Sequence, residues 1–430
     1  MDTSSIPPRF RMPIWLVLPL LALMLVIGLA GGYLVSNYAA GRALVPLQGQ
    51  GSCPLSQQEC DNFGSFWQAW QLASRNYVDT KAIDSTKMTD GAIEGMLDSL
   101  GDRGHTRYLS KDVAGEYQES LQGRFEGIGA YIDVKDGQPL IVQPIEGSPA
   151  ERAGIKPGDL ILKVNGASVF GVTVEELRTK VRGPDGSEVT LTVQHTGAEN
   201  PVDIKVKREQ IKVPSVSWRM LPNKVALVKL VQFSAPASDE MKQALTAAQA
   251  QGATSIVLDL RNNPGGYVNT LVDVASEFMP KDTVVLLQAD RNGDRKPYLT
   301  HEGGISLQTP LVVLINNNTA SAAEILAGAL RDQGRAKVIG EPTFGTATVL
   351  NQYDLNDGGK ILLGTAQWLT PKGKEVRGVG IAPDEEVPLK ADAQPLSPRE
   401  ASELSPEALQ TTTDTQLRRA LEIVDALAQK

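Results

Sequence analysis

The chain has 430 residues, of which 41% are hydrophobic and 21% charged, so it is long enough for two or three domains with cores of their own. Its net charge of −8, from 42 basic and 50 acidic residues without a basic cluster, argues against nucleic acid as a partner. Three histidines far apart in the sequence and two cysteines give no zinc-binding spacing, and nothing predicts a metal or another cofactor.

Residues 14–35 carry no charged side chain, and a stretch of about 22 mostly apolar residues is long enough to span a bilayer as a helix. Arg9 and Arg11 precede it, so the positive-inside rule places residues 1–13 in the cytoplasm and the bulk of the chain outside the cell membrane. A signal peptide cleaved near residues 38–40 is the alternative, but the apolar stretch is long for one. We expect an uncleaved, single-pass anchor.

The segment after the anchor, residues 36–62, is rich in Gly, Gln, Ser and Pro and is predicted to be a linker. It contains Cys53 and Cys60. An extracytoplasmic compartment permits a disulfide between them, and two free thiols are the alternative. Residues 63 to about 109 have a helical pattern and predict a small unit for packing or dimerisation.

Beyond Gly123 the pattern changes to short strands separated by turns. The run GSPAERAGIKPGDLILKVNG, residues 147–166, resembles the short helix, turn and strand of a PDZ domain. The resemblance implies a second PDZ helix at Val174–Val181 and a closing strand at Glu188–Gln194.

PDZ domains bind a peptide's terminal carboxylate through backbone N–H groups of a loop, and the peptide adds to the sheet as an edge strand. By resemblance, this loop is formed by Gly127, Ile128, Gly129 and Ala130. An ordinary tight turn before a strand is the alternative. The expected partners are therefore the C-termini of proteins or peptides.

Residues 212–388 alternate between strand and helix patterns, which predicts a mainly parallel sheet covered by helices. The expected strands are Val225–Leu230, Ser255–Asp259, Val284–Leu287, Leu311–Ile315, Lys337–Ile339 and Ile361–Leu363, with helices at Ser238–Gln251 and Asn269–Phe278. Ligands of such sheets bind beyond the carboxyl ends of the strands. Two Gly-containing loops, within residues 259–266 and 316–350, follow such ends.

Ser321 lies where the apolar strand Leu311–Ile315 has ended and a helix over Ala320–Leu330 begins. Backbone N–H groups at a helix N-terminus can stabilise an anion, which suits a serine nucleophile. A serine that only caps the helix is the alternative.

Several motifs in order resemble the C-terminal processing peptidases, also called carboxyl-terminal or tail-specific proteases, from about Phe63 to Pro388. They are GAIEGMLDSLGD, the PDZ run, LDLRNNPGG, NTASAAEILAGALRDQGRAKVIGEPTFG and GVGIAPD. The resemblance implies an α+β multidomain fold with a ClpP/crotonase-like α/β protease core, and a serine-type endopeptidase that cleaves proteins near their C-termini.

The resulting organisation has seven parts: a cytoplasmic N-terminus (1–13), a transmembrane anchor (14–35), a linker (36–62), a helical segment (63–110), a PDZ domain (114–208), a tail-specific protease core (211–390), and a linker with a C-terminal helix (391–430). That last helix is expected over Thr415–Gln429, capped by Asp414 and used for packing or oligomerisation.

Family members use a Ser–Lys dyad, in which an unprotonated lysine takes the proton of the serine. Ser321 matches the position of the family's nucleophile. The resemblance implies an oxyanion hole formed by the N–H group of Ala322 and that of Gly265 or Gly266, and the sequence does not decide between these two glycines.

The stretch from Phe344 to Leu350 matches the family's lysine segment, but Thr346 stands at the lysine position and Leu350 at that of a supporting glutamine. A threonine hydroxyl cannot act as a base near neutral pH. The candidate replacements are Lys360, Lys372, Lys374 and His301, and the spacing singles out none of them. Lysines in such loops are more typical of a solvated surface.

Two functions follow. The first is a membrane-anchored extracytoplasmic serine peptidase that recognises protein C-termini through its PDZ domain. The alternative is a catalytically impaired pseudoprotease, a binding or regulatory scaffold that acts alone or in homo- or hetero-oligomers.

Overall fold

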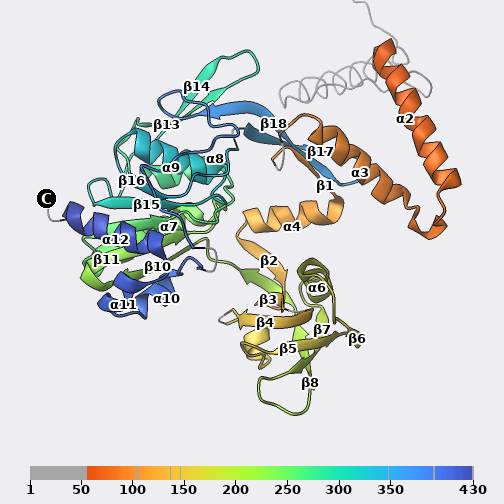
Figure 1. The fold of residues 1–430 in the computed structure, drawn as a ribbon, viewed down its shortest axis with the longest axis horizontal. Helices are drawn as coiled ribbons and strands as arrows, with labels where there is room; N and C mark the ends of the chain where they lie inside the picture. Colours follow the sequence, from red (N-terminus) through yellow and green to blue (C-terminus); the bar gives the residue numbers. More distant parts are fainter. Residues whose placement is uncertain are drawn as a thin grey trace, which may run out of the picture. The chain divides into compact units, whose positions relative to one another are not determined.

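The computed structural model describes residues 56–102, 105–135, 137–145, 147–346, 348–390 and 393–428. The chain divides into two compact units, residues 1–84 and 85–430. In the first unit, α2 (Gln57–Asn76) is followed by the short 3₁₀ helix η1 (Thr80–Ala82) (Figure 1). Helix α2 begins at Gln57, so the end of the predicted linker 36–62 is helical.

Within the described ranges, each helix is too short or too polar to traverse a bilayer. The predicted anchor at residues 14–35 lies outside these ranges, as does Cys53 of the predicted disulfide.

The second unit begins with α3 (Ser85–Asp98), β1 (Arg107–Leu109) and α4 (Lys111–Leu121). The prediction of helix up to residue 109 is wrong at its end. Residues Arg107–Leu109 pair antiparallel with β18 (Lys360–Leu369), and Tyr108 and Leu109 are buried. A pairing partner about 250 residues away overrides the local preference.

The PDZ domain has a five-stranded antiparallel path β3-β4-β5-β7-β8, with β6 paired to β5. These strands are β3 (Ala130–Lys135), β4 (Gln138–Pro144), β5 (Leu160–Val164), β6 (Ala167–Ser168), β7 (Glu188–Gln194) and β8 (Val202–Lys207). Two helices complete it, α5 (Pro149–Arg152) and α6 (Val174–Val181). The ranges expected for the second helix and closing strand are those of α6 and β7.

The PDZ domain is connected through β2 (Arg124–Gly127), which pairs antiparallel with β9 (Glu209–Lys212). Helix α6 begins with a reciprocal capping box, in which Thr173 Oγ1 accepts from the Glu176 N–H and the Glu176 carboxylate accepts from the Thr173 N–H. This arrangement satisfies two N-terminal donors that the helix would otherwise leave unpaired.

The protease core is built on a six-stranded sheet in the order β10-β11-β12-β15-β16-β19. Its strands are β10 (Val216–Leu221), β11 (Val225–Leu230), β12 (Ser255–Asp259), β15 (Leu311–Ile315), β16 (Lys337–Gly340) and β19 (Glu385–Glu386). All neighbours are parallel except β10 and β11. The buried apolar runs expected at β11, β12 and β15 form these strands.

Helices cover both faces of this sheet (Figure 1). Helices α7 (Ala237–Ala250), α8 (Val268–Ser276) and α9 (Ala322–Asp332) share one core with residues such as Val228, Leu258 and Val313. The other face packs on α10 (Pro398–Ser402), α11 (Pro406–Thr411) and α12 (Thr415–Ala428). Strands that are buried on both faces have continuous apolar runs in their sequences.

A second, antiparallel sheet accounts for two strands that were expected in the parallel sheet. Its order is β1-β18-β13-β14, with β17 also paired to β18. The additional strands are β13 (Val284–Ala289), β14 (Arg295–Leu299) and β17 (Thr348–Asp354). Val284–Leu287 and Ile361–Leu363 belong here because β13–β14 and β17–β18 are hairpins, whereas parallel strands need a longer crossover.

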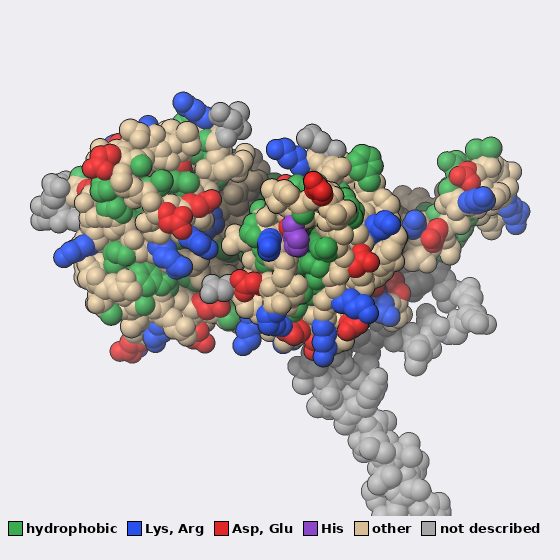
Figure 2. Space-filling view, turned by 90° about the horizontal axis from the view of Figure 1, so that it is seen from below, with side chains coloured by type: hydrophobic (Ala, Val, Ile, Leu, Met, Phe, Trp, Pro, Cys, Tyr) green, Lys and Arg blue, Asp and Glu red, His purple; other side chains and the backbone are tan. Residues whose placement is uncertain are grey.

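The surface carries both signs of charge. Figure 2 shows basic and acidic side chains interspersed on the visible face, without one large basic patch.

Candidate active site

Ser321 lies at the carboxyl end of the fully buried strand β15, at the N-terminus of α9. The turn before it is fixed by Thr319, whose hydroxyl donates to the Leu260 carbonyl (3.0 Å) and accepts from the Asn316 N–H (3.0 Å). The Ser321 backbone has φ 53° and ψ −122°, a region that non-glycine residues rarely adopt. Strain of this kind is concentrated at functional sites, which favours the nucleophile over a simple cap.

Gly265 and Gly266 lie against the same turn, and each has a backbone that only glycine adopts easily, with φ 100° and 143°. A Cβ atom at Gly265 would lie 2.7 Å from Ser321 Cβ, and one at Gly266 would lie 2.3 Å from the Phe233 carbonyl oxygen. The Gly265 N–H already donates to Asn263 Oδ1 (2.8 Å). The geometry therefore favours Gly266, with Ala322, as the pair of oxyanion donors.

Glu324, one helical turn into α9, is fully buried beneath Ser321 and was not among the site residues predicted from the sequence. Its carboxylate accepts from the Ser321 N–H (2.8 Å), the Gly345 N–H (2.7 Å), the Thr346 N–H (3.0 Å), and the hydroxyls of Thr343 (2.5 Å) and Thr346 (2.6 Å). Burial raises the pKa of Glu324, while these donors favour the charged form. Its position three residues after an N-cap serine is the signal that could have identified it.

Thr346 belongs to this network. Its hydroxyl donates to Glu324 and accepts from the Ser321 N–H at 2.8 Å. The side chain at the family's lysine position thus supports the backbone of Ser321, and its hydroxyl proton is directed to the Glu324 carboxylate.

Leu350, at the family's glutamine position, lies in β17 and packs against a small apolar cluster of Leu109, Ala114 and Leu362. Apolar packing therefore takes the place of a polar side chain. The intervening Ala347 lies outside the described residues.

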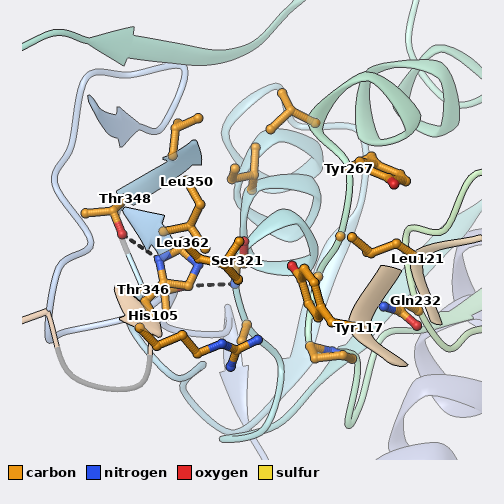
Figure 3. A pocket seen from close by; sticks show the side chains of 18 of the residues that line it. His105, Tyr117, Leu121, Gln232, Tyr267, Ser321, Thr346, Thr348, Leu350 and Leu362 are labelled. Atoms are coloured by element: carbon orange, nitrogen blue, oxygen red, sulfur yellow. Dashed lines mark hydrogen bonds between the residues drawn. The ribbon is translucent and has the colours of Figure 1, made fainter. Parts of the chain in front are cut away.

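A cavity of about 540 Å³ opens beside Ser321. Among the described residues that line it are Ser321, Thr346, Leu350, Gly265, Gly266, His105, Arg107, Tyr117 and Tyr267, and none is a lysine (Figure 3). Of the four candidate bases, Lys360 pairs with Asp354 (2.5 Å), and His301 is exposed and contacts Asp273 (3.0 Å). Neither these two nor Lys372 and Lys374 line the cavity.

His105 is a second ionisable residue at this site that was not predicted from the sequence. It precedes β1, and its Nδ1 lies 2.5 Å from Thr348 Oγ1 in β17. The Thr348 hydroxyl donates in turn to Asp102 Oδ2 (3.0 Å). Burial lowers the pKa of His105, partly offset by Asp102. No short motif signals this residue, because the pairing of β1 with β18 brings it to the cavity.

The predicted carboxylate-binding loop of the PDZ domain, Gly127 to Ala130, lines a groove of about 360 Å³ together with Arg178 and Val181 of α6. Strand β3, which follows the loop, pairs with β4 alone and is an edge of its sheet. The Gly129 backbone has φ 76°, and a Cβ atom there would lie 2.4 Å from Ser148 Cβ. The loop and the open edge have the arrangement that peptide addition requires.

The sequence was compared with known families. Residues 224–387 match peptidase family S41, residues 140–195 match a PDZ domain, and residues 25–113 match the activating protease CtpB N-terminal domain.

Two curated relatives come from Bacillus subtilis (strain 168). The carboxy-terminal processing protease CtpA is 38% identical over 335 residues, which cover 78% of this chain and 70% of that protein. The carboxy-terminal processing protease CtpB is 36% identical over 321 residues, covering 73% of this chain and 65% of that protein. The chain thus matches about two thirds of the length of these relatives.

A solved structure of a protein assigned to the S41 proteases, from Bacteroides fragilis NCTC 9343, has a TM-score of 0.54 at 18% identity. It covers 88% of this chain and 100% of that chain, and the likeness shows the fold. The sequence identity to CtpA establishes the family, and the matches to peptidase family S41 and the PDZ domain agree with it. The chain belongs to the C-terminal processing peptidases of family S41 and carries their PDZ domain.

Proposed function

We propose that the chain is an active serine peptidase that binds the C-termini of proteins through its PDZ domain and cleaves them at Ser321. The observation that carries the proposal is the strained Ser321, whose backbone is fixed by Glu324 and Thr346 beside a 540 Å³ cavity. Maintaining such a backbone costs about 1 to 3 kcal/mol and has no purpose in a simple helix cap. The relatives' names, carboxy-terminal processing proteases, support the same activity.

The substrate's C-terminus is expected to bind between β3 and α6. Its main chain pairs with the open edge of β3, and its carboxylate accepts hydrogen bonds from the loop Gly127 to Ala130.

We also propose that residues 14–35 anchor the chain in the cell membrane, with the peptidase on the extracytoplasmic side. The support is the charge-free apolar stretch after Arg9 and Arg11.

A catalytically impaired scaffold is the second candidate. The observation that favours it is the commitment of the Thr346 hydroxyl to Glu324, together with the lack of a lysine among the described residues lining the cavity. Such a protein would hold C-termini without cleaving them.

The test is cleavage of an unstructured polypeptide by the purified full chain and by Ser321→Ala. We expect wild type to cleave a substrate with a free C-terminal carboxylate, and to act at least ten times more slowly when that carboxylate is amidated. Ser321→Ala should abolish both reactions.

The double variant Thr346→Lys with Leu350→Gln separates the two candidates. Cleavage by wild type that is lost in Ser321→Ala supports the peptidase. An inactive wild type that the double variant converts into an active enzyme establishes the scaffold instead. Equal turnover by wild type and Ser321→Ala would show that the activity does not come from this site.

A further inference from the structure

We propose that His105 is the general base that deprotonates Ser321, oriented by Thr348 and Asp102. The proposal rests on the peptidase function proposed above and identifies the group that replaces the family's lysine. It makes the site a Ser–His site in which a threonine connects the histidine to a carboxylate.

The first support is location. His105 and Ser321 line the same cavity. In Figure 3 the imidazole ring lies between Thr348 and Ser321, with Nδ1 on the Thr348 side and the other ring nitrogen on the Ser321 side. A general base needs to reach the hydroxyl proton directly or through one water molecule.

The second support is the direction of the hydrogen bonds. Asp102 Oδ2 accepts from the hydroxyls of Thr106 (2.6 Å) and Thr348 (3.0 Å). Since the Thr348 proton is directed to Asp102, its oxygen is left to accept from His105 Nδ1–H (2.5 Å). A proton held on Nδ1 leaves the Nε2 lone pair free as the base.

Gly364 in β18 has no side chain, which leaves space for the hydrogen bonds between Asp102, Thr348 and His105. A Cβ atom at Gly364 in β18 would lie 2.9 Å from Thr348 Cβ and 3.0 Å from Asp102 Oδ2. The Gly364 N–H donates to Thr106 Oγ1 (2.9 Å), which fixes the loop that carries Asp102 and His105. Strand β18 therefore lies against Asp102, Thr106 and Thr348 at this one glycine.

The charges near His105 suit a base. Burial lowers its pKa, Asp102 raises it and Arg107 lowers it, so the net pKa lies below the ordinary value of 6.5. The ring is consequently neutral at pH 7 and able to accept a proton. The negative charge of Asp102 then stabilises the imidazolium that forms.

The reaction balances with water as the only co-reactant. Ser321 Oγ attacks the substrate carbonyl carbon while His105 takes the hydroxyl proton, and the oxyanion receives hydrogen bonds from Gly266 and Ala322. The C–N bond breaks as His105 returns the proton to the leaving amine. His105 then takes a proton from water, whose oxygen attacks the carbonyl carbon of the acyl ester. As the C–Oγ bond breaks, His105 returns this proton to Ser321 Oγ, and the acid product leaves with both residues regenerated.

The decisive experiment compares the full chain with His105→Gln and with the matched control His301→Gln, an exposed histidine that also contacts an aspartate but lies outside the cavity. We expect kcat/KM to fall by roughly 10²- to 10⁴-fold in His105→Gln and to stay within about twofold in His301→Gln. Added imidazole should partly restore His105→Ala. If His105→Gln is as active as wild type, His105 is not the base, and the proposed peptidase function is unaffected. A wild type inactive on every substrate overturns both.

The pH profile provides a test that does not depend on the folding of the His105 variants. Wild-type kcat/KM should rise with pH through a midpoint below 6.5, as the base loses its proton. Asp102→Asn removes the charge that raises the pKa of His105, so the midpoint should move to lower pH and activity should fall at least tenfold. A wild-type profile with its midpoint above pH 8, or an unmoved midpoint in Asp102→Asn, contradicts the proposal.

Discussion

At the level of single residues, Ser321 is held in place by a buried carboxylate. Glu324 joins the start of α9 to the loop of residues 343–346. A buried carboxylate is stable only when its oxygens receive hydrogen bonds, and this one receives them from both segments. The same contacts fix the unusual backbone of Ser321, so the loop and this serine are positioned together.

The variant Thr346→Val tests this role because it keeps the shape of the side chain and removes its hydroxyl. Glu324 then loses one donor, and the Ser321 N–H loses one acceptor. We expect the free energy of unfolding to fall by about 1 to 3 kcal/mol, measured by urea denaturation, and peptidase activity to fall with it. The control Thr346→Ser, which keeps the hydroxyl, should retain most of both. If Thr346→Val were as stable and active as wild type, the hydroxyl would not support the site.

At the level of elements, the C-terminal helices are part of the protease core. Asp414 accepts from the Leu417 N–H (3.0 Å) as the predicted cap of α12, and it also accepts from Arg261 (2.7 Å) in the loop after β12. Arg261 is fully buried, and its side chain makes two further hydrogen bonds to Asp259, each 2.9 Å. This cluster connects α12 to the loop that carries Gly265 and Gly266, so packing is the role that the structure shows for the helix.

Arg261→Met should be among the most destabilising single changes in the core. It leaves Asp414 buried without its cation and Asp259 with Lys229 alone, at 3.7 Å, and breaking such a buried pair costs about 3 to 5 kcal/mol. Thermal and urea unfolding at pH 7 measure the loss. The matched control is Arg399→Met, which breaks an exposed pair with Glu403 and should change stability by no more than about 0.5 kcal/mol. A loss in Arg261→Met as small as that of the control would contradict the proposed role of the cluster.

The same cluster predicts an acid limit to stability. Burial alone would raise the pKa of Asp259, but Arg261 and Lys229 bring it below its usual 3.8. A carboxyl group whose pKa is lower in the folded state contributes stability that is fully present above its unfolded value. That contribution is lost as the pH falls through the folded value.

At the level of the whole molecule, the elements that could be predicted from the sequence are those that depend on local residue patterns. Strands β11, β12 and β15 are buried apolar runs, and α6 and β7 follow a recognisable PDZ run, so their ranges agree with the structure. The antiparallel sheet and His105 could not be predicted in this way. His105 and Thr348 are 243 positions apart, and only the pairing of β1 with β18 brings them together. Thr346 was identified as a departure from the family, but its bond to Glu324 depends on how the loop folds back on α9.

The proposed anchor would determine the cellular location of the whole molecule, and its sequence allows a direct test. Residues 14–35 lack charge, so the full chain should sediment with membranes and resist alkaline carbonate extraction, with its bulk open to protease added from the extracytoplasmic side. The double variant Leu23→Arg with Val26→Arg places two charges in the middle of the segment. Each raises the free energy of membrane insertion by about 2.5 to 3.5 kcal/mol, so the protein should be released from the membrane. The matched pair Leu23→Ile with Val26→Leu should stay bound. A shortened, soluble wild-type chain that begins near residue 41 would show instead that the segment is a cleaved signal peptide.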